Sequence, residues 1–226
     1  FLKNNTLEDL CISRPKERLA WGIPLPFDSN YVTYVWFDAL TNYFSIPRAR
    51  GEEADLWPAD IHVIGKDILK FHAVYWPIML KAAGLALPKQ VLVHGWWQKD
   101  NQKMSKSIGN VVDPVAVIDD WGLDAFRYYV VRELAIGPDG NWTDESFTNR
   151  YHAELANGLG NLVNRSLSML TRYREGIVPP QHDELATEAI AARDKLVGEL
   201  KSSELQAGLM TIWSFIARMN QYVDET

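Results

Sequence analysis

The sequence predicts an α/β fold followed by an all-helical part, and three observations lead to this prediction. Apolar runs at residues 61–64 and 90–94 have the length of strands, and a segment of helical period lies between them. The alternation of strand and helix is typical of a doubly wound sheet, whose inner strands are buried on both faces. Beyond Asn141 the helical period continues without strong strand signals, so we place the boundary between the two parts near this residue.

The first expected strand covers residues 31–37, which are rich in β-branched and aromatic side chains. Asp38 follows this strand and is a residue type that caps helices, so we expect a helix from there through Tyr43. The second strand, residues 61–64, is expected to end at Gly65.

Asp67 is expected to cap the next helix, in which apolar residues recur at helical spacing and which Gly84 ends. The third strand, residues 90–94, follows. Ligands of doubly wound sheets bind beyond the carboxyl ends of the strands. Gly65 and His94 lie at two such ends, so we expect a binding cleft beside them.

In the helical part, Thr143 or Asp144 is expected to begin a long helix, because both residue types cap helix N-termini. Gly176 and the prolines at 179 and 180 end its pattern. Three further helices are predicted over residues 124–129, 183–200 and 203–222.

Composition excludes several classes of protein. The 226 residues are 47% apolar and 23% charged, which is typical of a soluble globular protein. The net charge of −6 gives no global attraction for nucleic acid, so any RNA contact needs a local basic patch. The single cysteine, Cys11, cannot form an internal disulfide or a cysteine-based metal site, and this fits a reducing, cytoplasmic compartment. The sequence has no apolar run long enough to span a membrane, and no signal peptide is recognisable.

The most informative segment covers residues 102–110, where two lysines, two serines and a glycine stand close together. A polar loop of this kind can close over a polyphosphate and neutralise charge on a leaving pyrophosphate. The glycine spacing of a P-loop is absent, so this would be a different kind of phosphate clamp. The alternative for the segment alone is a solvated turn.

Several motifs, in this order along the chain, resemble the methionyl-tRNA synthetases, a family of class I aminoacyl-tRNA synthetases. The motifs are WGIP at 21–24, YVWFDAL at 34–40, HVIGKDI at 62–68, FH at 71–72, WP at 76–77, VHG at 93–95, KMSKS at 103–107, DAFRY at 124–128 and LGNL at 159–162. The resemblance covers nearly the whole chain, and the ordered set is more specific than any one motif.

This resemblance implies the second half of a Rossmann-like class I synthetase catalytic domain, followed by an all-helical anticodon-binding domain. The implied divisions are a tail of an insertion at 1–20, the catalytic half at 21–113, a stem-contact region at 114–142 and a truncated anticodon-binding domain at 143–226. The family's His-x-Gly-His motif is absent, so the missing N-terminal half is an expected partner, and we expect the chain alone to be inactive or nearly so. Zinc is expected only in the absent insertion, if at all, and no metal ligand is assigned here.

The implied reaction has two steps, with methionine, ATP and tRNA(Met) as substrates and Mg²⁺ accompanying ATP. Methionine's carboxylate attacks the α-phosphate of ATP and releases pyrophosphate, and the aminoacyl group then moves to the tRNA. By resemblance, Lys103 and Lys106 are the catalytic residues of the lysine loop, and Lys106 is the expected pyrophosphate contact. The full ATP-binding set is Gly65, His94, Gly95, Lys103, Ser105, Lys106 and Ser107.

The resemblance also assigns residues to methionine and to the anticodon. The implied methionine-binding set is Trp36, Ala39, Leu40, Tyr43, Asp67, Ile68, Phe71, His72 and Trp76, with Arg14 as a supporting partner of Asp67 near the amino group. A thioether is polarisable and favours aromatic contacts, while the Tyr43 hydroxyl or the His72 imidazole is expected near the sulfur. Leu40 replaces a proline found in some members. The implied anticodon-binding residues are Asn157, Asn161 and Arg165, whose spacing places them on one face of an α-helix.

Other interpretations stay open at this level. Any one of the pocket aromatics, taken alone, is as well explained as a core residue, and His62 is expected to be a hydrogen-bonded core or edge histidine. A non-catalytic paralogue that binds tRNA or a partner is one alternative function. A class I synthetase for isoleucine, valine, leucine or cysteine is another, and amino-acid selectivity would separate it from the methionine enzyme.

Overall fold

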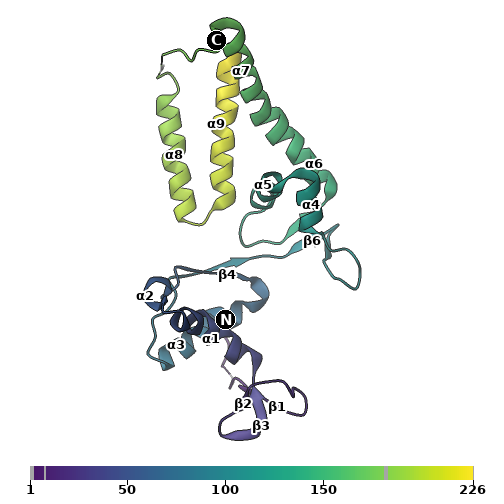
Figure 1. Ribbon diagram of the computed structural model, residues 1–226, viewed down its shortest axis with the longest axis vertical. Coiled ribbons are helices and arrows are strands. Elements are labelled where there is room, and N and C mark those ends of the chain that lie inside the picture. The colour runs from purple at the N-terminus through teal and green to yellow at the C-terminus, as the bar shows by residue number, and fades with distance from the viewer. Residues whose placement is uncertain (1–2, 8, 181–182, 226) are drawn as a thin grey trace. The chain divides into compact units, whose positions relative to one another are not determined.

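The computed structural model describes residues 3–7, 9–180 and 183–225. The chain forms two compact units, which divide between Leu92 and Val93 (Figure 1). Each unit has its own hydrophobic core.

The first unit combines a small antiparallel sheet with helices and a second pair of strands. Its sheet has the strand order β1-β3-β2, and β4 pairs with β5 in a separate two-stranded sheet. The elements are β1 (Ser13–Pro15), β2 (Pro24–Leu25), β3 (Asp28–Thr33), α1 (Val35–Ala49), α2 (Glu53–Leu56), β4 (Ile61–Gly65), the 3₁₀ helix η1 (Lys66–Ile68), the π-helix η2 (Phe71–Tyr75), α3 (Trp76–Ala82) and β5 (Gln90–His94). The second and third predicted strands are therefore confirmed.

The predicted strand at residues 31–37 is wrong in its second half. Strand β3 ends at Thr33, and α1 begins at Val35 with Tyr34 as its N-cap. Asp38 therefore lies inside the first turn and caps nothing. Tertiary packing overrides the local β propensity of residues 34–37, because the helix buries Leu40 against Trp76 and Leu80 in the core of this unit.

The predicted helix after Gly65 exists, but it is not one regular α-helix. It starts as a 3₁₀ turn, is α-helical over residues 69–70, passes through the π-helical segment η2 and continues as α3 from Trp76. Asp67 lies within the 3₁₀ turn, and no side chain caps its start, so the expected Asp67 cap is wrong. Gly84 follows the end of α3 with φ +69°, a conformation that favours glycine.

The second unit has a small sheet and a set of helices. The sheet has the order β7-β6-β8, with β6 antiparallel to β7 and parallel to β8. The elements are β6 (Trp97–Lys99), β7 (Gln102–Lys103), α4 (Pro114–Trp121), α5 (Leu123–Glu133), β8 (Gly140–Trp142), α6 (Asp144–Arg150), the π-helix η3 (Tyr151–Gly160), α7 (Asn161–Arg174), α8 (Ala186–Lys201) and α9 (Leu205–Glu225).

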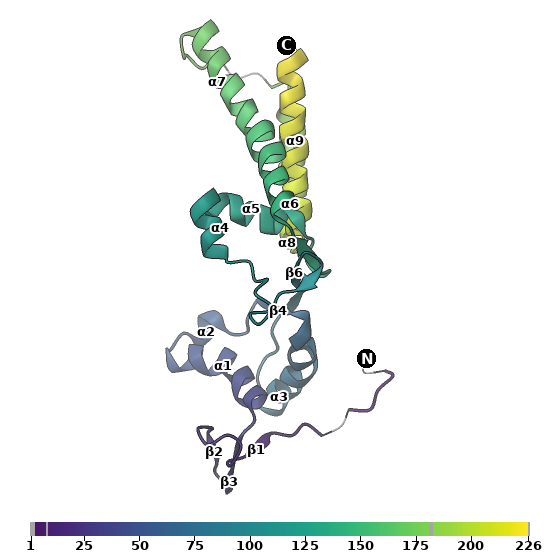
Figure 2. The same ribbon diagram turned by 90° about the vertical axis from the view of Figure 1, so that its right-hand side faces the viewer.

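The predictions for the helical part are confirmed with small shifts in their ends. Thr143 caps α6, because its hydroxyl accepts a hydrogen bond of 3.0 Å from the amide of Ser146. The long helix continues without a break through η3 and α7 and runs beside α9 (Figure 2). Helices α8 and α9 pack side by side as a hairpin (Figure 1).

The core of the second unit is aromatic. Tyr129 from α5, Trp142 from β8 and Phe147 from α6 are almost fully buried, and their rings lie 4.8–5.3 Å apart. Trp97 and Met104 pack against this cluster from the hairpin that leads into the lysine loop. The base of that loop is therefore fixed to a rigid aromatic core.

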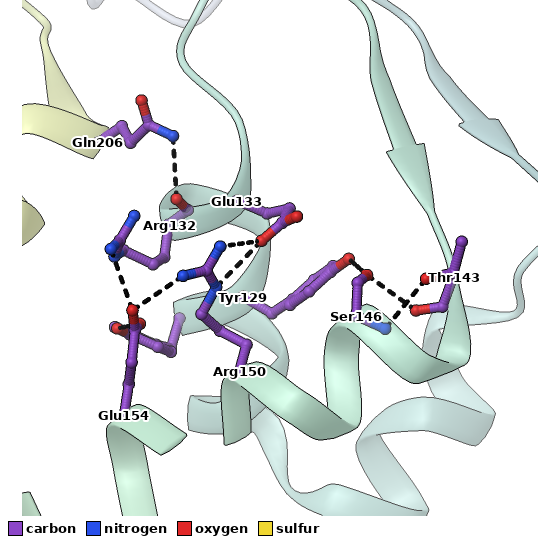
Figure 3. A network of polar contacts seen from close by, with 9 residues as sticks. Tyr129, Arg132, Glu133, Thr143, Ser146, Arg150, Glu154 and Gln206 are labelled. Carbon is purple, nitrogen blue, oxygen red and sulfur yellow. Dashed lines mark hydrogen bonds and ion pairs between the residues drawn. The ribbon is translucent and has the colours of Figure 1, made fainter. Parts of the chain in front are cut away.

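A polar network fixes the long helix to α5, and Glu154 in η3 is its centre (Figure 3). Its carboxylate accepts hydrogen bonds from Tyr128, from Arg132 at 3.0 Å and from Arg150 at 2.8 Å. Arg150 also donates twice to Glu133, at 2.6 and 3.0 Å. These charged side chains are only 16–28% exposed, so they have lost much of their hydration. The hydrogen bonds to their partners compensate for this loss.

Helix α9 joins the same network. The side-chain amide of Gln206 donates to the carbonyl of Arg132, near the C-terminal end of α5, at 3.0 Å (Figure 3). This bond satisfies one of the carbonyls that a helix end leaves without a partner.

Candidate functional site

One face of α1 builds a candidate amino-acid pocket in the first unit. Trp36, Ala39, Leu40 and Tyr43 follow the i, i+3, i+4, i+7 spacing of a single helix face. Phe71 and His72 come from η2, and Trp76 begins α3. The structure thus brings together most of the residues predicted from the sequence for methionine.

A pair of polar side chains lies within this aromatic group. His72 is 1% exposed, and its Nε2 lies 3.0 Å from the hydroxyl of Tyr43. Its Nδ1 lies 3.0 Å from the carbonyl of Ile68, which can only accept a hydrogen bond. In the neutral ring, Nδ1 therefore carries the hydrogen, and Nε2 accepts one from the hydroxyl of Tyr43.

Aromatic stacking shapes the rest of the pocket. The rings of Trp36 and Phe71 stack with 4.3 Å between centroids and 12° between planes. His72 meets the edge of Trp36 at 6.2 Å. Leu40 is 1% exposed in the core cluster with Trp76, so the leucine at this position fills the core behind the aromatic side chains.

The lysine loop in the second unit has a fixed base and an exposed tip. Lys103 ends strand β7, and its ammonium lies 4.5 Å from the ring centroid of Trp96, a cation–π contact. Residues 106–109 form a turn, with Gly109 at φ +76°. Lys106 is exposed on this turn. Both lysines are exposed, but Lys106 lies on the turn itself, whereas Lys103 lies on a strand against Trp96.

Asn110 connects two parts of this loop by hydrogen bonds, and it is not among the site residues predicted from the sequence. Its side-chain oxygen accepts from the amide of Ser105 at 2.8 Å, and its amide donates to the carbonyl of Lys103 at 3.2 Å. The hydroxyls of Ser105 and Ser107 lie 2.8 Å apart. Asparagine is a residue type that bonds backbone in turns, but here it bonds residues five and seven positions earlier, a pairing that the sequence pattern does not specify.

His94, the last residue of β5, and Gly95 lie just beyond the division between the two units. The Nδ1 of His94 lies 2.8 Å from the carbonyl of Gly95. A Cβ on Gly95 would lie 2.0 Å from the carbonyl oxygen of Pro138, so only glycine fits here. The close approach that this glycine permits is to the chain's own backbone.

Comparisons with known proteins agree with this geometry. Residues 1–167 match the family model "tRNA synthetases class I (M)". The chain belongs to this family. The match includes both the aromatic pocket and the lysine loop.

Individual class I (M) relatives resemble the whole chain. A methionine–tRNA ligase from Clostridium tetani is 46% identical over all of it, and one from Halalkalibacterium halodurans is 44% identical over 97% of it. The chain spans 36% and 35% of the lengths of these relatives. The crystal structure of the Mycobacterium tuberculosis methionyl-tRNA synthetase bound by methionyl-adenylate is 40% identical and matches with a TM-score of 0.84, over 96% of this chain and 44% of that one. The chain thus has a class I synthetase fold, with mixed α/β content and a helical C-terminal region.

Three other predicted residues of the first unit lie in β4, η1 and β1. Gly65 ends β4, and Asp67 lies in η1, where it lines a cavity of about 760 Å³ with Lys66 and Lys70. The guanidinium of Arg14 lies 4.2 Å from the ring centroid of Tyr34 and donates to the carbonyl of Ser13 at 3.0 Å. Pairing of Arg14 with Asp67 stays a prediction.

The residues predicted for the anticodon lie along the long helix. Asn161 and Arg165 share a face of α7, and Arg165 forms an ion pair of 2.5 Å with Asp224 of α9. Asn157 lies in the π-helix η3. Because a π-helix bonds residues five apart instead of four, the spacing argument does not determine the direction of Asn157.

No helix among the residues that the structure describes is long and apolar enough to cross a membrane. In the same described part of the chain, no three His, Cys, Asp or Glu side chains gather as metal ligands would.

His62 is a buried, hydrogen-bonded strand histidine, as predicted from the sequence, and it lies against two of the pocket aromatics. It is buried in β4 and accepts a hydrogen bond of 3.3 Å from the indole of Trp76. Burial, and to a lesser degree the neighbouring charge of His72, lower the pKa of His62 below its ordinary value of 6.5. The folded protein therefore holds this ring in its neutral form.

This lowered pKa predicts a loss of stability in acid. As the pH falls below 6.5, His62 binds a proton in the unfolded chain, whereas in the folded chain it stays neutral down to its lowered pKa. Between these two pKa values the unfolded chain binds more protons, so the free energy of unfolding falls as the pH falls. One proton contributes at most about 1.4 kcal/mol per pH unit. Urea unfolding of the wild-type chain and of His62→Gln at pH 7.5 and 5.5 tests this. An equal loss of stability in the two proteins would contradict the prediction.

Proposed function

We propose that the complete protein activates methionine with ATP and transfers it to tRNA(Met), as a methionine–tRNA ligase. The observation that carries the proposal is the Tyr43–His72 pair inside an aromatic pocket, in a chain of the class I (M) family. The oxygen of methionine's carboxylate attacks the α-phosphorus of ATP, and the bond from that phosphorus to pyrophosphate breaks. The adenylate then gives its aminoacyl group to the terminal adenosine of the tRNA.

The pocket selects methionine through shape and polarisability. The thioether packs against the stacked rings of Trp36 and Phe71. Sulfur makes favourable contacts with aromatic rings, and a branched aliphatic side chain has no sulfur to make them. Tyr43 and His72 place the polar atoms of the pocket where the sulfur lies. Asp67 and Arg14 act at the amino group. A related enzyme of known structure is described with methionyl-adenylate bound, which supports an adenylate intermediate here.

The lysine loop stabilises the leaving group. The ammonium of Lys106, exposed on its turn, neutralises charge that develops on pyrophosphate in the transition state. Lys103, Ser105 and Ser107 shape and support the loop, and Gly65, His94 and Gly95 line the nucleotide. Mg²⁺ enters with ATP and is held mainly by the phosphate oxygens, which are the hard ligands that it prefers.

The long helix reads the anticodon of tRNA(Met). Asn161 and Arg165 offer hydrogen bonds to unstacked bases, which is how proteins recognise single-stranded RNA loops, and Asn157 adds a third amide. The domain assignments that accompany this role are a Rossmann-like catalytic half in residues 21–113, a stem-contact region in 114–142 and an anticodon-binding domain from 143. We place the activity in the cytoplasm, where translation takes place.

Methionine-dependent ATP–pyrophosphate exchange tests the proposal. The chain is mixed with a separately produced N-terminal half of the same protein, and methionine, leucine and isoleucine are compared. We expect exchange only in the mixture and only with methionine. Exchange with leucine or isoleucine would indicate a synthetase for another amino acid, and no exchange in an associated mixture would indicate a non-catalytic paralogue.

A further inference from the structure

His62 connects three aromatic side chains behind the methionine pocket. It is 5% exposed in β4, and its Nε2 accepts the hydrogen bond from the indole N–H of Trp76, which is itself 2% exposed. Its ring lies against the ring of Tyr43, with 4.3 Å between centroids and a tilt of 42°. Trp57 lies on another side, with 6.3 Å between centroids.

The chemistry of the indole fixes the hydrogen on this imidazole. An indole N–H can only donate, so Nε2 of His62 must carry a lone pair and the ring must be neutral with its hydrogen on Nδ1. The ionisable neighbours that face His62 are His72, at 6.2 Å between ring centroids, and Tyr43, at 4.3 Å. The lowered pKa of His62 agrees with a neutral ring.

The position of His62 makes two pocket residues depend on it. Without an acceptor, the buried N–H of Trp76 would lose its hydrogen bond, which is unfavourable unless the indole moves to find another partner. Movement of Trp76 or of the supported Tyr43 ring would disturb the hydrogen bond from Tyr43 to His72. His62 itself contacts no predicted substrate group, so it acts through these neighbours.

We propose that His62 is a positioning residue for methionine binding, whose neutral ring holds Trp76 by a hydrogen bond and Tyr43 by a tilted ring contact. This inference rests on the proposed function, because it concerns the affinity for methionine. Two effects separate this role from simple filling of the core. Loss of the acceptor raises the KM for methionine without an equal change for ATP, and a smaller residue that keeps an acceptor restores binding.

The test uses the complete protein with two substitutions at the same position. His62→Phe keeps a ring and removes the acceptor, whereas His62→Gln removes the ring and keeps a carbonyl oxygen that can accept from the indole. In methionine-dependent pyrophosphate exchange we expect His62→Phe to raise the KM for methionine about tenfold, within the cost of one unmade buried hydrogen bond. The KM for ATP stays within about twofold, and His62→Gln raises the KM for methionine less than about threefold.

A double-mutant cycle with Trp76→Phe identifies the hydrogen bond itself. Trp76→Phe removes the donor, so in that background His62→Phe is expected to change the KM for methionine by less than about twofold. Thermal unfolding checks that each variant is folded. If His62→Phe does not fold, His62→Leu takes its place, because it removes the acceptor with a smaller side chain.

Three results would overturn the inference: equal effects of the Phe and Gln variants, a tenfold effect that persists in the Trp76→Phe background, or parallel changes in the KM for ATP. A wild-type protein that shows no methionine-dependent exchange would overturn the proposed function as well. Normal exchange in the wild type with an unchanged KM in His62→Phe would overturn the role of His62 alone.

Discussion

Replacing Lys106 with alanine is expected to lower the rate of methionine-dependent pyrophosphate exchange in the complete protein by at least about 100-fold. Removal of one group that stabilises developing charge typically costs a factor of about 10²–10³ in rate. Lys106 lies on an exposed turn, whereas Lys103 lies against Trp96 at the end of a strand, so the full effect is expected only at Lys106. The KM for methionine should change little, because the pocket aromatics are unaltered.

The matched control is Lys89→Ala. Lys89 is an exposed lysine of the first unit that pairs with Asp60 at 2.6 Å, and neither residue is assigned to the site. Exchange by this variant should stay within about twofold of the wild type. Lys106→Arg keeps the charge with a different geometry and should recover part of the rate. A normal exchange rate in Lys106→Ala would show that Lys106 does not stabilise the leaving group.

Helices and strands could be predicted where the sequence pattern and the packing environment favour the same structure. The helices after residue 143 and the strands at 61–64 and 90–94 have patterns that their environments support, and the structure contains them. Residues 34–37 show why the first strand was extended too far. Val35, Trp36 and Phe37 favour strands locally, but α1 needs Trp36 and Leu40 on the same helix face to cover Trp76.

The π-helical segments could not be predicted from a helical period. Segments η2 and η3 both contain predicted binding residues, His72 in the first and Asn157 in the second. An extra residue in a helical turn changes the direction of the side chains that follow, and a pattern of 3.6 residues contains no signal for it. Resemblance to a family assigned residues to the pocket, whereas the hydrogen bonds of the folded chain identified the partner of His62 and the role of Asn110.

Replacing Glu154 with alanine is expected to destabilise the helical unit more than any other single change discussed above. Three donors bond to this carboxylate, and two of them, Arg132 and Arg150, are cations whose side chains are only 16% and 28% exposed. Removing one partner of a fully buried pair costs about 3–5 kcal/mol, so this partly buried network is expected to lose somewhat less than that and clearly more than the roughly 0–1 kcal/mol of an exposed pair. The pKa of Tyr128 should fall towards its ordinary value in this variant, because the bond to Glu154 contributes, after burial, to raising it.

This cost is measured by urea unfolding of Glu154→Ala and of a matched control, with the circular dichroism of the helices as the signal. Asp194→Ala removes a carboxylate of the same unit whose ion pair with Arg193 is exposed, and exposed pairs are worth about 0–1 kcal/mol. Glu154→Gln keeps one acceptor oxygen and should lie between the two. A loss in Glu154→Ala no larger than that in Asp194→Ala would mean that water replaces the carboxylate in this network. The long helix would then be held on α5 by the aromatic core and by the Arg150–Glu133 ion pair, and the predicted anticodon residues would not depend on Glu154 for their position.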